Sequence, residues 1–484
     1  MSKTIIWWAR RDLRVADNTA LFNARQDADI VVPVYILDRA LLTADRLHGP
    51  RVTWLLDGLR ALDADLAGIG GRLIVRTGKP EDMLIELAQQ LDAQAVYFNR
   101  DYSPYAATRD RQVMDRLAAI GVAAHDFKDE VIHEAAETFS NSQQPYSVFG
   151  PYRRLWETLP KPSIVPVPDR LNTPTQIDSE PIPVPAAFGV TESIVPIVAA
   201  GESHAQARLS DFIADRIYGY ADSRNFPAVD GTATISPYLR WGMLSIRTAF
   251  HAAREARERA PSASTRDNAE TWIGELIWRD FYYQVLARNP HIVTGAYRPE
   301  YDAIRWQDNS GFLDAWQTGH TGFPIVDAAM RQMNTVGWMH NRCRMIVASF
   351  LCKDLLIDWR VGERYFMQRL LDGDLASNNG GWQWSAGTGT DAAPYFRIFN
   401  PTTQGKKFDP DGAYIRNWLP ELAKVPDKFI HEPSSLPKAA QQAIHMVIGQ
   451  DYPAPIVDHG EQRERVMALY STRANGTLTR SDLQ

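Results

Sequence analysis

One segment of the chain, TWIGELIWRDFYYQ at residues 271–284, combines aromatic, acidic and basic side chains at helical spacing. Trp272, Glu275, Arg279 and Tyr282 recur every three or four residues, so a helix would place them on one face. A helix that packed this face into a core would bury charge at a free-energy cost. The segment therefore either lines a ligand-binding site or forms a solvent-exposed face with a Glu–Arg pair. Taken alone, its sequence favours the exposed face.

Two further segments mix polar and apolar side chains in a similar way. In GWMHNRCRM (337–345), Asn341, Arg344 and Met345 share one side of a predicted helix. DGDLASNNGGWQWS (372–385) predicts a glycine-rich loop that carries acids, amides and two tryptophans. Such loops between helices often bind ligands and often only turn the chain. Asp372 and Asp374 lack further metal ligands nearby, so we expect no metal site there.

The segment GTATISPYLRWG (231–242) places small residues and hydroxyls before a predicted helix. Backbone N–H groups at a helix start bind anions, which would suit a diphosphate. Alternatively, Ser236 followed by Pro237 is a good helix start without any ligand, with Ser236 as the N-cap. The two interpretations are compatible.

The surrounding secondary-structure elements must position these segments. The sequence pattern of the first 130 residues or so predicts an α/β domain. Apolar runs alternate with stretches of helical periodicity, which is typical of a parallel sheet covered on both faces. We expect a parallel five-stranded, Rossmann-like sheet, although no GxGxxG follows the first strand. The predicted strands are 4–10, 30–38, 72–77, 95–100 and 123–127, and the predicted helices are 51–67, 80–91 and 105–119.

A proline-rich stretch at 160–200 is typical of an extended connector, and the pattern beyond it is almost wholly helical. We therefore expect an α/β domain at 1–130, a long linker at 131–200 and an all-helical domain at 201–484. The predicted helices of the last domain are 204–219, 236–258, 264–287, 322–335, 339–356 and 361–371.

The composition bounds the class of protein. The chain has 484 residues, a net charge of −6, fourteen tryptophans and two cysteines, Cys343 and Cys352. Two cysteines cannot form a disulfide framework or a four-cysteine zinc site, and we expect both to be buried thiols. No apolar run reaches the length of a membrane span, and the N-terminus lacks a secretory signal. We expect a reduced, cytoplasmic protein that uses a local basic patch if nucleic acid is its partner.

Together these segments resemble the DNA photolyase/cryptochrome family, most closely the microbial class I cyclobutane pyrimidine dimer photolyases. The resemblance runs nearly end to end. Its motifs are WWARRDLRVADNTAL, YADSRNFPAVDGTATISPYLRWG, ELIWRDFY, TGFPIVDAAMRQMNTVGWMHNRCRMIVASFLCKDLLIDWR and DGDLASNNGGWQWSAGTGTDAAPYFRIFNPTTQGKKFD.

The resemblance implies that the helical domain holds a U-shaped, noncovalent FAD. Arg344 would pair with Asp372, and Asn378 would lie beside flavin N5, where a neutral amide favours repair over signalling. The residues implied to bind FAD are Tyr220, Thr232, Ala233, Thr234, Ile235, Ser236, Arg344, Asp372, Gly373, Asp374 and Asn378.

The implied reaction is light-driven repair of cyclobutane pyrimidine dimers in single- or double-stranded DNA. Photolyases are among the enzymes that flip their target bases out of the helix. Trp278 and Trp384 would be the aromatic walls of the pocket for the dimer. Glu275 and Asn341 would be its hydrogen-bond partners, and Met345 a packing contact. The residues implied to contact DNA are Arg224, Glu275, Tyr282, Asn341, Arg342 and Gln404, with Lys406 and Lys407 nearby.

Trp306, Trp359 and Trp382 match the family's three-tryptophan electron-transfer chain, although by pattern alone they would be core residues. The family's α/β domain also carries an antenna chromophore. Ala106 occupies the position where the folate-binding type has a carboxylate, which favours an 8-hydroxy-deazaflavin and leaves methenyltetrahydrofolate as the alternative. The residues implied to line the antenna site are Tyr35, Ile36, Leu37, Asp38, Arg51, Asp101 and Arg240.

Three other functions compete with dimer repair. A cryptochrome-like photoreceptor would usually carry a long C-terminal extension, whereas this chain ends at Gln484 without a low-complexity tail. Enzymes of the family that repair the (6-4) photoproduct use a histidine pair, whereas here Met339 precedes His340. A general flavin-dependent oxidoreductase would need neither the tryptophan pocket nor the cation rim. We expect a monomeric repair enzyme with no membrane association.

Overall fold

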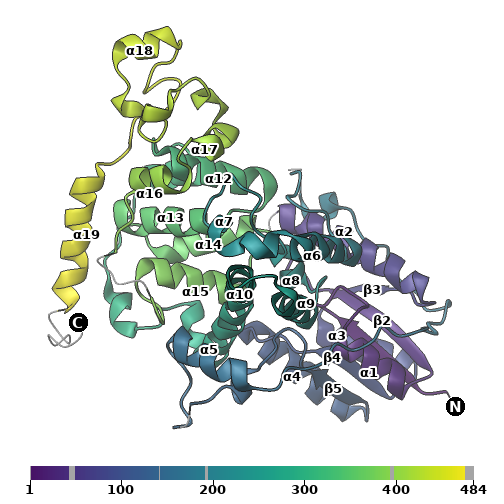
Figure 1. Ribbon diagram of the computed structural model, residues 1–484. Helices are drawn as coiled ribbons and strands as arrows, with labels where there is room; N and C mark the ends of the chain where they lie inside the picture. The colour runs from purple at the N-terminus through teal and green to yellow at the C-terminus, as the bar shows by residue number, and fades with distance from the viewer. Residues whose placement is uncertain (1, 43–48, 141, 191–193, 393–396, 475–484) are drawn as a thin grey trace. The chain divides into compact units, whose positions relative to one another are not determined.

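The structure, a computed structural model, describes residues 2–42, 49–140, 142–190, 194–392 and 397–474 (Figure 1). The chain divides into two compact units. Unit 1 comprises Met1–Asp222, Thr232–Pro290 and Leu371–Ala376, and unit 2 comprises Ser223–Gly231, His291–Leu370 and Ser377–Gln484. The domain boundaries at 130 and 200 stay a prediction.

Unit 1 contains the expected parallel sheet, which has five strands within the described residues (Figure 1). The strand order is β3-β2-β1-β4-β5, and Ile5 of β1 pairs with Val31 of β2 on one side and Ala95 of β4 on the other. All five predicted strands are confirmed to within two residues. The strands are β1 (Thr4–Ala9), β2 (Ile30–Leu37), β3 (Ile74–Thr77), β4 (Ala95–Asn99) and β5 (Ala123–Phe127).

The helices between the strands cover the sheet. α3 and α4 pack against each other over a core that includes Ile6, Val34 and Phe98. The sequence prediction missed α1, which is a short helix in which only Ala20, Leu21 and Ala24 are buried, too few to give a clear helical pattern. The side chain of Asn18 caps α1 by accepting a hydrogen bond from the backbone N–H of Leu21 at 3.1 Å. The helices are α1 (Thr19–Asp27), α2 (Gly49–Gly68), α3 (Pro80–Gln90) and α4 (Pro104–Ala119).

The strand order reverses between β1 and β4, which are neighbours in the sheet although β2 and β3 come between them in sequence. In open α/β sheets, ligands bind beyond the carboxyl ends of the strands at this switch point. Arg10 and Arg11 directly follow β1, and Asp101 lies two residues after β4. The fold therefore brings charged side chains from different parts of the sequence to one edge of the sheet.

The proline-rich stretch runs beside the edge strand β3. Val75 donates its backbone N–H to Ser179 Oγ at 3.0 Å, and its carbonyl accepts from the N–H of Glu180 at 3.1 Å. Among the described residues of 160–200, the only helical segment is the 3₁₀-helix η2 (Pro185–Phe188). The stretch is extended, as expected, and it covers an edge that would otherwise expose backbone groups. It lies within unit 1, and its role as a linker between domains stays a prediction.

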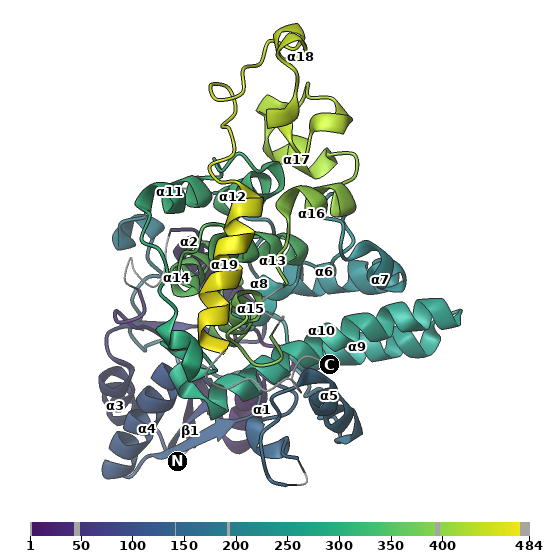
Figure 2. The same ribbon diagram turned by 90° about the vertical axis from the view of Figure 1, so that its left-hand side faces the viewer.

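The other helices of unit 1 lie after the linker, apart from α5, and α9 and α10 run side by side (Figure 2). The single helix expected at 236–258 is wrong: the chain breaks at Gly242, which has φ +63°. A Cβ atom at Gly242 would overlap the backbone of Arg11 and Asp12, so only glycine fits. The helices are α5 (Phe149–Thr158), α6 (Glu202–Ala214), α7 (Tyr220–Ser223), α8 (Ser236–Trp241), α9 (Ile246–Arg259) and α10 (Ala263–Arg288), with 3₁₀-helices η1 (Ala135–Glu137) and η3 (Arg216–Gly219). The 3₁₀-helix η4 (Pro290–Val293) begins at the last residue of this stretch and continues into unit 2.

The regular elements of unit 2 within its described residues are helices joined by loops. The glycine-rich loop expected at 372–385 is wrong, because α15 (Leu375–Ala386) occupies most of it. Tertiary packing overrides the low helix propensity of Gly380 and Gly381. The other helices are α11 (Ser310–Thr318), α12 (Pro324–Val336), α13 (Asn341–Ser349), α14 (Trp359–Arg369), α16 (Pro401–Phe408), α17 (Ala413–Trp418), α18 (Lys438–Ala443) and α19 (His459–Ala474), with 3₁₀-helices η5 (Pro299–Ala303), η7 (Pro420–Leu422), η8 (Asp427–Phe429) and η9 (Pro433–Ser435).

The helix expected at 339–356 is also divided: α13 ends at Ser349 and a π-helical turn, η6 (Phe350–Asp354), follows. The C-terminal helix α19 docks on this turn, where His459 contacts the buried carboxylate of Asp354. Cys343 and Cys352 are free and buried, as expected, in the core of this unit. Burial raises the pKa of the Cys343 thiol to about 12, so it is not a nucleophile at neutral pH.

No helix within the described residues has the length and apolar character that crossing a bilayer requires.

Candidate functional site

Ser236 does not cap a helix, contrary to one of the two interpretations of its segment. The N-cap of α8 is Ile235, which makes no side-chain capping bond. The Ser236 hydroxyl instead donates a hydrogen bond to Asp372 Oδ2 at 2.6 Å. Two segments that lie 136 residues apart, both implied to bind FAD, are thus joined directly within unit 1.

The segment before α8 is held in shape by Arg208 of α6. Its Nε donates to the carbonyl of Ala233 at 2.9 Å, and its Nη2 donates to Thr234 Oγ1 at 3.1 Å. Thr234 has φ +52°, an uncommon value for a residue other than glycine. Such a conformation persists where the surroundings over-determine it, which is typical of binding segments. Sequence reasoning missed Arg208, which lies in an otherwise ordinary helix.

Two arginines hold the backbone of the turn 372–374. The carbonyl of Gly373 accepts from Arg51 Nη2 at 3.0 Å and from Arg240 Nε at 2.8 Å. Burial, together with the charge of Arg240, lowers the pKa of Arg51 to about 9. Both arginines were implied to line the antenna site, and here their guanidinium groups contact the turn that was implied to bind FAD.

Asp374 lies in a buried charged network. Its Oδ2 accepts from Arg11 Nη2 at 2.6 Å and from the Tyr283 hydroxyl at 2.7 Å. Glu130 also contacts Arg11 and lies 3.7 Å from Arg279. Its Oε1 lies 2.7 Å from the same Tyr283 hydroxyl, whose single proton bonds one of the two carboxylates at a time. Burial raises the pKa of Glu130 to about 7. Sequence reasoning missed Arg11, Glu130 and Tyr283, although the position of Arg11 directly after the central strand was a signal.

The residues of unit 1 fit a group such as FAD. The Nη1 atom of Arg240 is buried and has no hydrogen-bond partner among the described residues. A buried guanidinium N–H group without an acceptor is costly and suits a ligand rich in oxygen acceptors. Of the implied FAD residues in this unit, Tyr220, Ala233, Thr234, Ile235, Asp372, Gly373 and Asp374 are buried, Thr232 is half-buried and Ser236 is exposed.

The face of α10 that was expected to be exposed is not. Trp272 is buried and its ring lies 5.1 Å from that of Phe212. Arg279 takes part in the Glu130 network, and Glu275 is half-buried. The interpretation of an exposed face with a Glu–Arg pair is therefore wrong, because the tertiary structure covers this helix on several sides.

Trp278, on the neighbouring face of α10, stacks on Phe149 of α5. The ring centroids are 3.7 Å apart and the planes differ by 6°. Tyr282 lies one turn further, with its ring 5.5 Å from that of Trp278. Because Trp278 is half-buried and Phe149 covers one of its faces, only the opposite face could stack a base. Sequence reasoning missed Phe149.

In unit 2, two consecutive amides of α15 bind one residue of α14. Asn378 Nδ2 donates to the backbone carbonyl of Glu363 at 3.0 Å, and Asn379 Nδ2 donates to Glu363 Oε1 at 3.1 Å. Burial raises the pKa of Glu363 to about 7. One N–H group of the Asn378 amide is thus engaged, and its oxygen is the atom that can accept from another donor.

The tryptophans implied to transfer electrons lie in unit 2. Trp382 and Trp359 are buried and Trp306 is half-buried. The Trp382 ring lies against Gly362 of α14, where a Cβ atom would overlap it, and Trp359 begins the same helix. Trp382 also packs edge-on to Trp316, at 6.1 Å between ring centroids.

Of the cationic residues implied to contact DNA, Arg342 lies in the first turn of α13. Arg342 Nη2 donates to Asn225 Oδ1 at 2.6 Å, and its guanidinium lies 4.3 Å from the ring centre of Phe408. Burial lowers the pKa of Arg342, and the nearby charge of Arg224 lowers it further. Lys406 and Lys407 form the basic end of α16. Asn341 is exposed, and Arg224, Arg344, Met345, Trp384 and Gln404 are half-buried.

His340 caps α13 rather than facing solvent. Its Nδ1 accepts from the backbone N–H of Arg342 at 3.1 Å. Burial and the charges of Arg344, Arg342 and Arg224 lower the pKa of His340 to about 4. The imidazole is therefore neutral at physiological pH, and it is unsuited to donate a proton as an imidazolium.

The residues implied to line the antenna site, apart from Arg51 and Arg240, lie near the carboxyl ends of β2 and β4. Asp38 accepts from the Tyr105 hydroxyl, and Asp101 lies 3.5 Å from Arg11. Burial acts to raise the pKa of Asp101, but Arg11, Arg109 and Arg10 lower it to about 2. Ile36 and Leu37 are buried, and Tyr35 is half-buried.

Two family models match the chain. The FAD binding domain of DNA photolyase matches residues 272–472, and the DNA photolyase domain matches residues 5–171. A deoxyribodipyrimidine photo-lyase of Synechococcus sp. is 41% identical over an alignment of 485 positions, gaps included. The alignment covers 97% of each chain. The chain therefore belongs to the DNA photolyase family, and it contains the family's FAD-binding domain.

Solved structures agree with this assignment. A bacterial class III photolyase from Agrobacterium tumefaciens has a TM-score of 0.92 and 37% sequence identity, and the match covers 98% of each chain. A cryptochrome from Synechocystis sp. has a TM-score of 0.90 and 30% identity over 96% of this chain and 99% of that one. These likenesses establish the family rather than a class within it.

Proposed function

We propose that this protein is a deoxyribodipyrimidine photo-lyase, which repairs cyclobutane pyrimidine dimers in DNA under light. The identity of about 40% to curated photo-lyases over nearly the whole chain supports this function. The observation that carries it is the arrangement on α10: Trp278 stacks on Phe149 at 3.7 Å, which covers one face of its ring, and the half-buried Glu275 lies one turn earlier. A flat ring beside a carboxylate suits a pyrimidine pair that has left the helix.

Reduced FAD, when bound and excited by light, supplies the electron that opens the cyclobutane ring, and the electron returns so that no net redox change occurs. The protein's part is to bind, orient and exclude water. Two segments of unit 1 would hold the cofactor. The residues are Tyr220, Thr232, Ala233, Thr234, Ile235, Ser236, Asp372, Gly373 and Asp374. Arg344 is proposed as a further cofactor-binding residue.

Asn378 would present its amide oxygen to flavin N5–H. The hydrogen bond from its nitrogen to the Glu363 carbonyl supports this orientation. Because the amide nitrogen points toward Glu363, the amide oxygen points away from Glu363. A neutral amide cannot protonate the flavin, which favours repair. Around the dimer, Trp384 would form the second aromatic wall, with Asn341 as a hydrogen-bond partner and Met345 as a packing contact.

DNA binding would use the cations of unit 2. Arg224, Arg342, Lys406 and Lys407 would contact phosphates, together with Tyr282 and Gln404. This local patch would overcome the overall charge of −6, because phosphate binding depends on the cations near the backbone. UV-damaged DNA, single- or double-stranded, is the proposed partner, and we expect the enzyme to act as a cytoplasmic monomer.

Trp382, Trp359 and Trp306 would form an electron-transfer chain from the flavin to the surface. The burial of the first two and the partial exposure of Trp306 support this order. Near the carboxyl ends of the sheet strands, Tyr35, Ile36, Leu37, Asp38 and Asp101 would line an antenna site. We favour an 8-hydroxy-deazaflavin there, with methenyltetrahydrofolate as the alternative, because Ala106 offers no carboxylate.

A cryptochrome-like photoreceptor is the second candidate, favoured by the likeness to the Synechocystis protein. One experiment decides between the two functions. The reduced holoprotein is irradiated with blue light in the presence of UV-treated oligothymidylate, and intact thymine monomers are measured. Recovery of monomers in the light but not in darkness is expected for the photo-lyase. No recovery, with FAD still bound and reduced, would contradict repair and favour the photoreceptor.

A further inference from the structure

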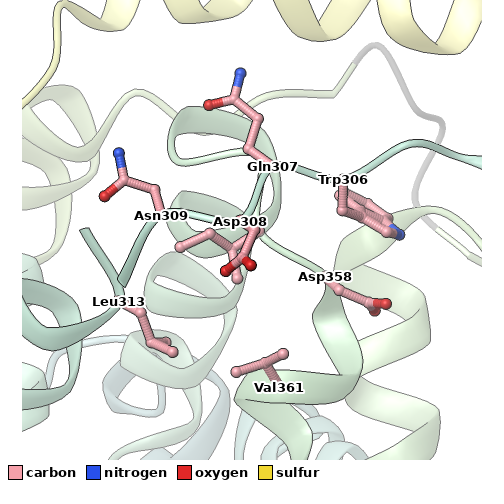
Figure 3. A pocket seen from close by; sticks show the side chains of 8 residues that line it. Trp306, Gln307, Asp308, Asn309, Leu313, Asp358 and Val361 are labelled. Atoms are coloured by element: carbon pink, nitrogen blue, oxygen red, sulfur yellow. The ribbon is translucent and has the colours of Figure 1, made fainter. Parts of the chain in front are cut away.

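A cavity of about 270 Å³ opens in unit 2 beside Trp306 (Figure 3). Residues 306–309, the segment before α11, form one wall, and Leu313 of α11 with the start of α14 forms the other. Figure 3 shows Asp308 between Trp306 and Leu313, with Val361 on the opposite side of the opening. The lining residues are Trp306, Gln307, Asp308, Asn309, Leu313, Ile357, Asp358 and Val361.

The charge of this lining is one-sided. It contains two carboxylates and no basic side chain. Asp358 is already engaged: it caps α14 through the backbone N–H of Arg360 at 2.9 Å and pairs with the Arg360 guanidinium at 3.0 Å. Asp308 is exposed and supplies the negative charge that remains in the cavity.

The remaining lining defines the chemistry of a ligand. Leu313, Ile357 and Val361 offer an apolar wall for a short hydrocarbon chain, and Trp306 offers an indole ring that attracts cations. Asn309 caps α11 with its side chain, so its position is fixed. A small organic ammonium compound would place its charge near Asp308 and Trp306 and its hydrocarbon against the apolar wall.

We infer that this cavity is a binding site for small organic cations that reduce Trp306, with aminothiols as the chemical class. The inference rests on the proposed electron-transfer chain, in which Trp306 is the outermost member. After Trp306 has given up one electron, the sulfur of a bound aminothiol returns one electron to the indole and releases its S–H proton to water. Two of the resulting thiyl radicals couple to a disulfide, so atoms and electrons balance.

The cavity would act by raising the local concentration of the donor. A single exposed carboxylate and one aromatic ring give a weak site, in the millimolar range. Such a site still selects among donors of equal size, because a neutral or anionic thiol gains nothing from Asp308. The reaction with a cationic thiol should therefore saturate and should weaken at high ionic strength.

The test follows the decay of the oxidised Trp306 signal after a light flash on the holoprotein. With 2-mercaptoethylamine, the decay rate should rise hyperbolically with concentration, whereas with 2-mercaptoethanol it should rise linearly. Asp308→Asn should lower the initial slope for 2-mercaptoethylamine at least threefold and leave that for 2-mercaptoethanol unchanged. Asp314→Asn is the matched control: Asp314 is exposed on α11 and outside the cavity lining, and this variant should behave as the wild type.

A second readout does not depend on the flavin. The protein is labelled with 5-fluorotryptophan, the Trp306 resonance is assigned with Trp306→Phe, and inert ethylammonium is titrated. A saturable shift that Asp308→Asn removes supports the site. Equal saturation by both thiols, or no effect of Asp308→Asn on either readout, would overturn the inference. If no oxidised Trp306 forms at all, the proposed electron-transfer chain is wrong, and so is the role of this cavity in returning electrons to Trp306. The ethylammonium titration then decides by itself whether the cation site exists.

Discussion

The side-chain nitrogen of Asn378 donates a hydrogen bond to the backbone carbonyl of Glu363 at 3.0 Å. The adjacent Asn379 binds the carboxyl group of the same glutamate at 3.1 Å. Through these two bonds, α14 fixes the direction of the amide that we place beside the flavin. Glu363 is itself buried, so its carboxyl group, which Asn379 binds, is costly to ionise.

Glu363 predicts a pH dependence of stability. Burial raises its pKa from 4.5 to about 7, so the folded protein binds more protons than the unfolded chain between these values. Stability that Glu363 contributes is therefore present below pH 4.5 and is lost as the pH rises towards 7. At about 1.4 kcal/mol per pKa unit, the loss is roughly 3 kcal/mol. Urea unfolding at pH 5 and pH 8 measures it.

The variant Glu363→Gln should remove this part of the pH dependence, since its amide cannot ionise. Glu300→Gln is the control, because Glu300 is an exposed glutamate of the same unit. If the wild type and Glu363→Gln lose stability equally between pH 5 and pH 8, the raised pKa is wrong.

Trp382→Phe should block light-driven reduction of oxidised flavin but spare repair by enzyme that is reduced beforehand. The Trp382 Nε1 has no hydrogen-bond partner among the described residues, so phenylalanine breaks no hydrogen bond there. Trp316→Phe, in the same core, is the control and should keep photoreduction. Absorption spectra during illumination measure the first effect and dimer cleavage the second. Loss of both activities in Trp382→Phe would make this residue structural.

Ser236→Ala should weaken FAD binding. The variant removes the hydroxyl that donates to Asp372 at 2.6 Å, and a hydrogen bond to a charged group contributes about 1.5–3 kcal/mol. We expect the dissociation constant of FAD to rise at least tenfold, as measured by reconstitution of the apoprotein. Ser264→Ala, at an exposed position of α10, should leave it unchanged. If Ser236→Ala binds FAD with unaltered affinity, the Ser236–Asp372 hydrogen bond does not contribute to cofactor binding.

Glu275→Ala should lower the quantum yield of dimer repair several-fold while FAD stays bound, because the carboxylate is proposed to hydrogen-bond the flipped dimer. Glu270→Ala is the control on the same helix, since Glu270 pairs with Arg153 and Arg257 instead. Repair yield is measured with UV-treated oligothymidylate at saturating concentration. Normal repair in Glu275→Ala would remove this residue from the reaction.

Arg342→Ala should weaken binding to damaged and undamaged DNA alike. It should also reduce the slope of log affinity against log salt by about 1, as expected for one lost phosphate contact. Asn225→Ala, which removes the partner of Arg342 but no charge, should keep the slope. Fluorescence anisotropy at several salt concentrations gives both quantities, and an unchanged slope in Arg342→Ala would take this residue off the DNA-binding surface.

The sequence by itself determined the elements whose pattern is local. The apolar runs at 30–38 and 95–100 predicted strands within a residue of β2 and β4, because a strand buried on both faces shows its burial in consecutive residues. Long, dense motifs also determined the family, and with it the implied cofactor residues. Local patterns failed where packing overruled propensity, as in α15 with its paired glycines and at the break beside Gly242.

Only the tertiary structure decided which distant residues meet. Arg11 and Asp374 are 363 residues apart in the chain and 2.6 Å apart in space. Arg51, expected at the antenna site, binds the carbonyl of Gly373, and Phe149 covers one face of Trp278. No periodicity encodes such pairs, because each partner's local sequence satisfies its own helix, strand or turn. The contact exists only once the whole unit has folded around both.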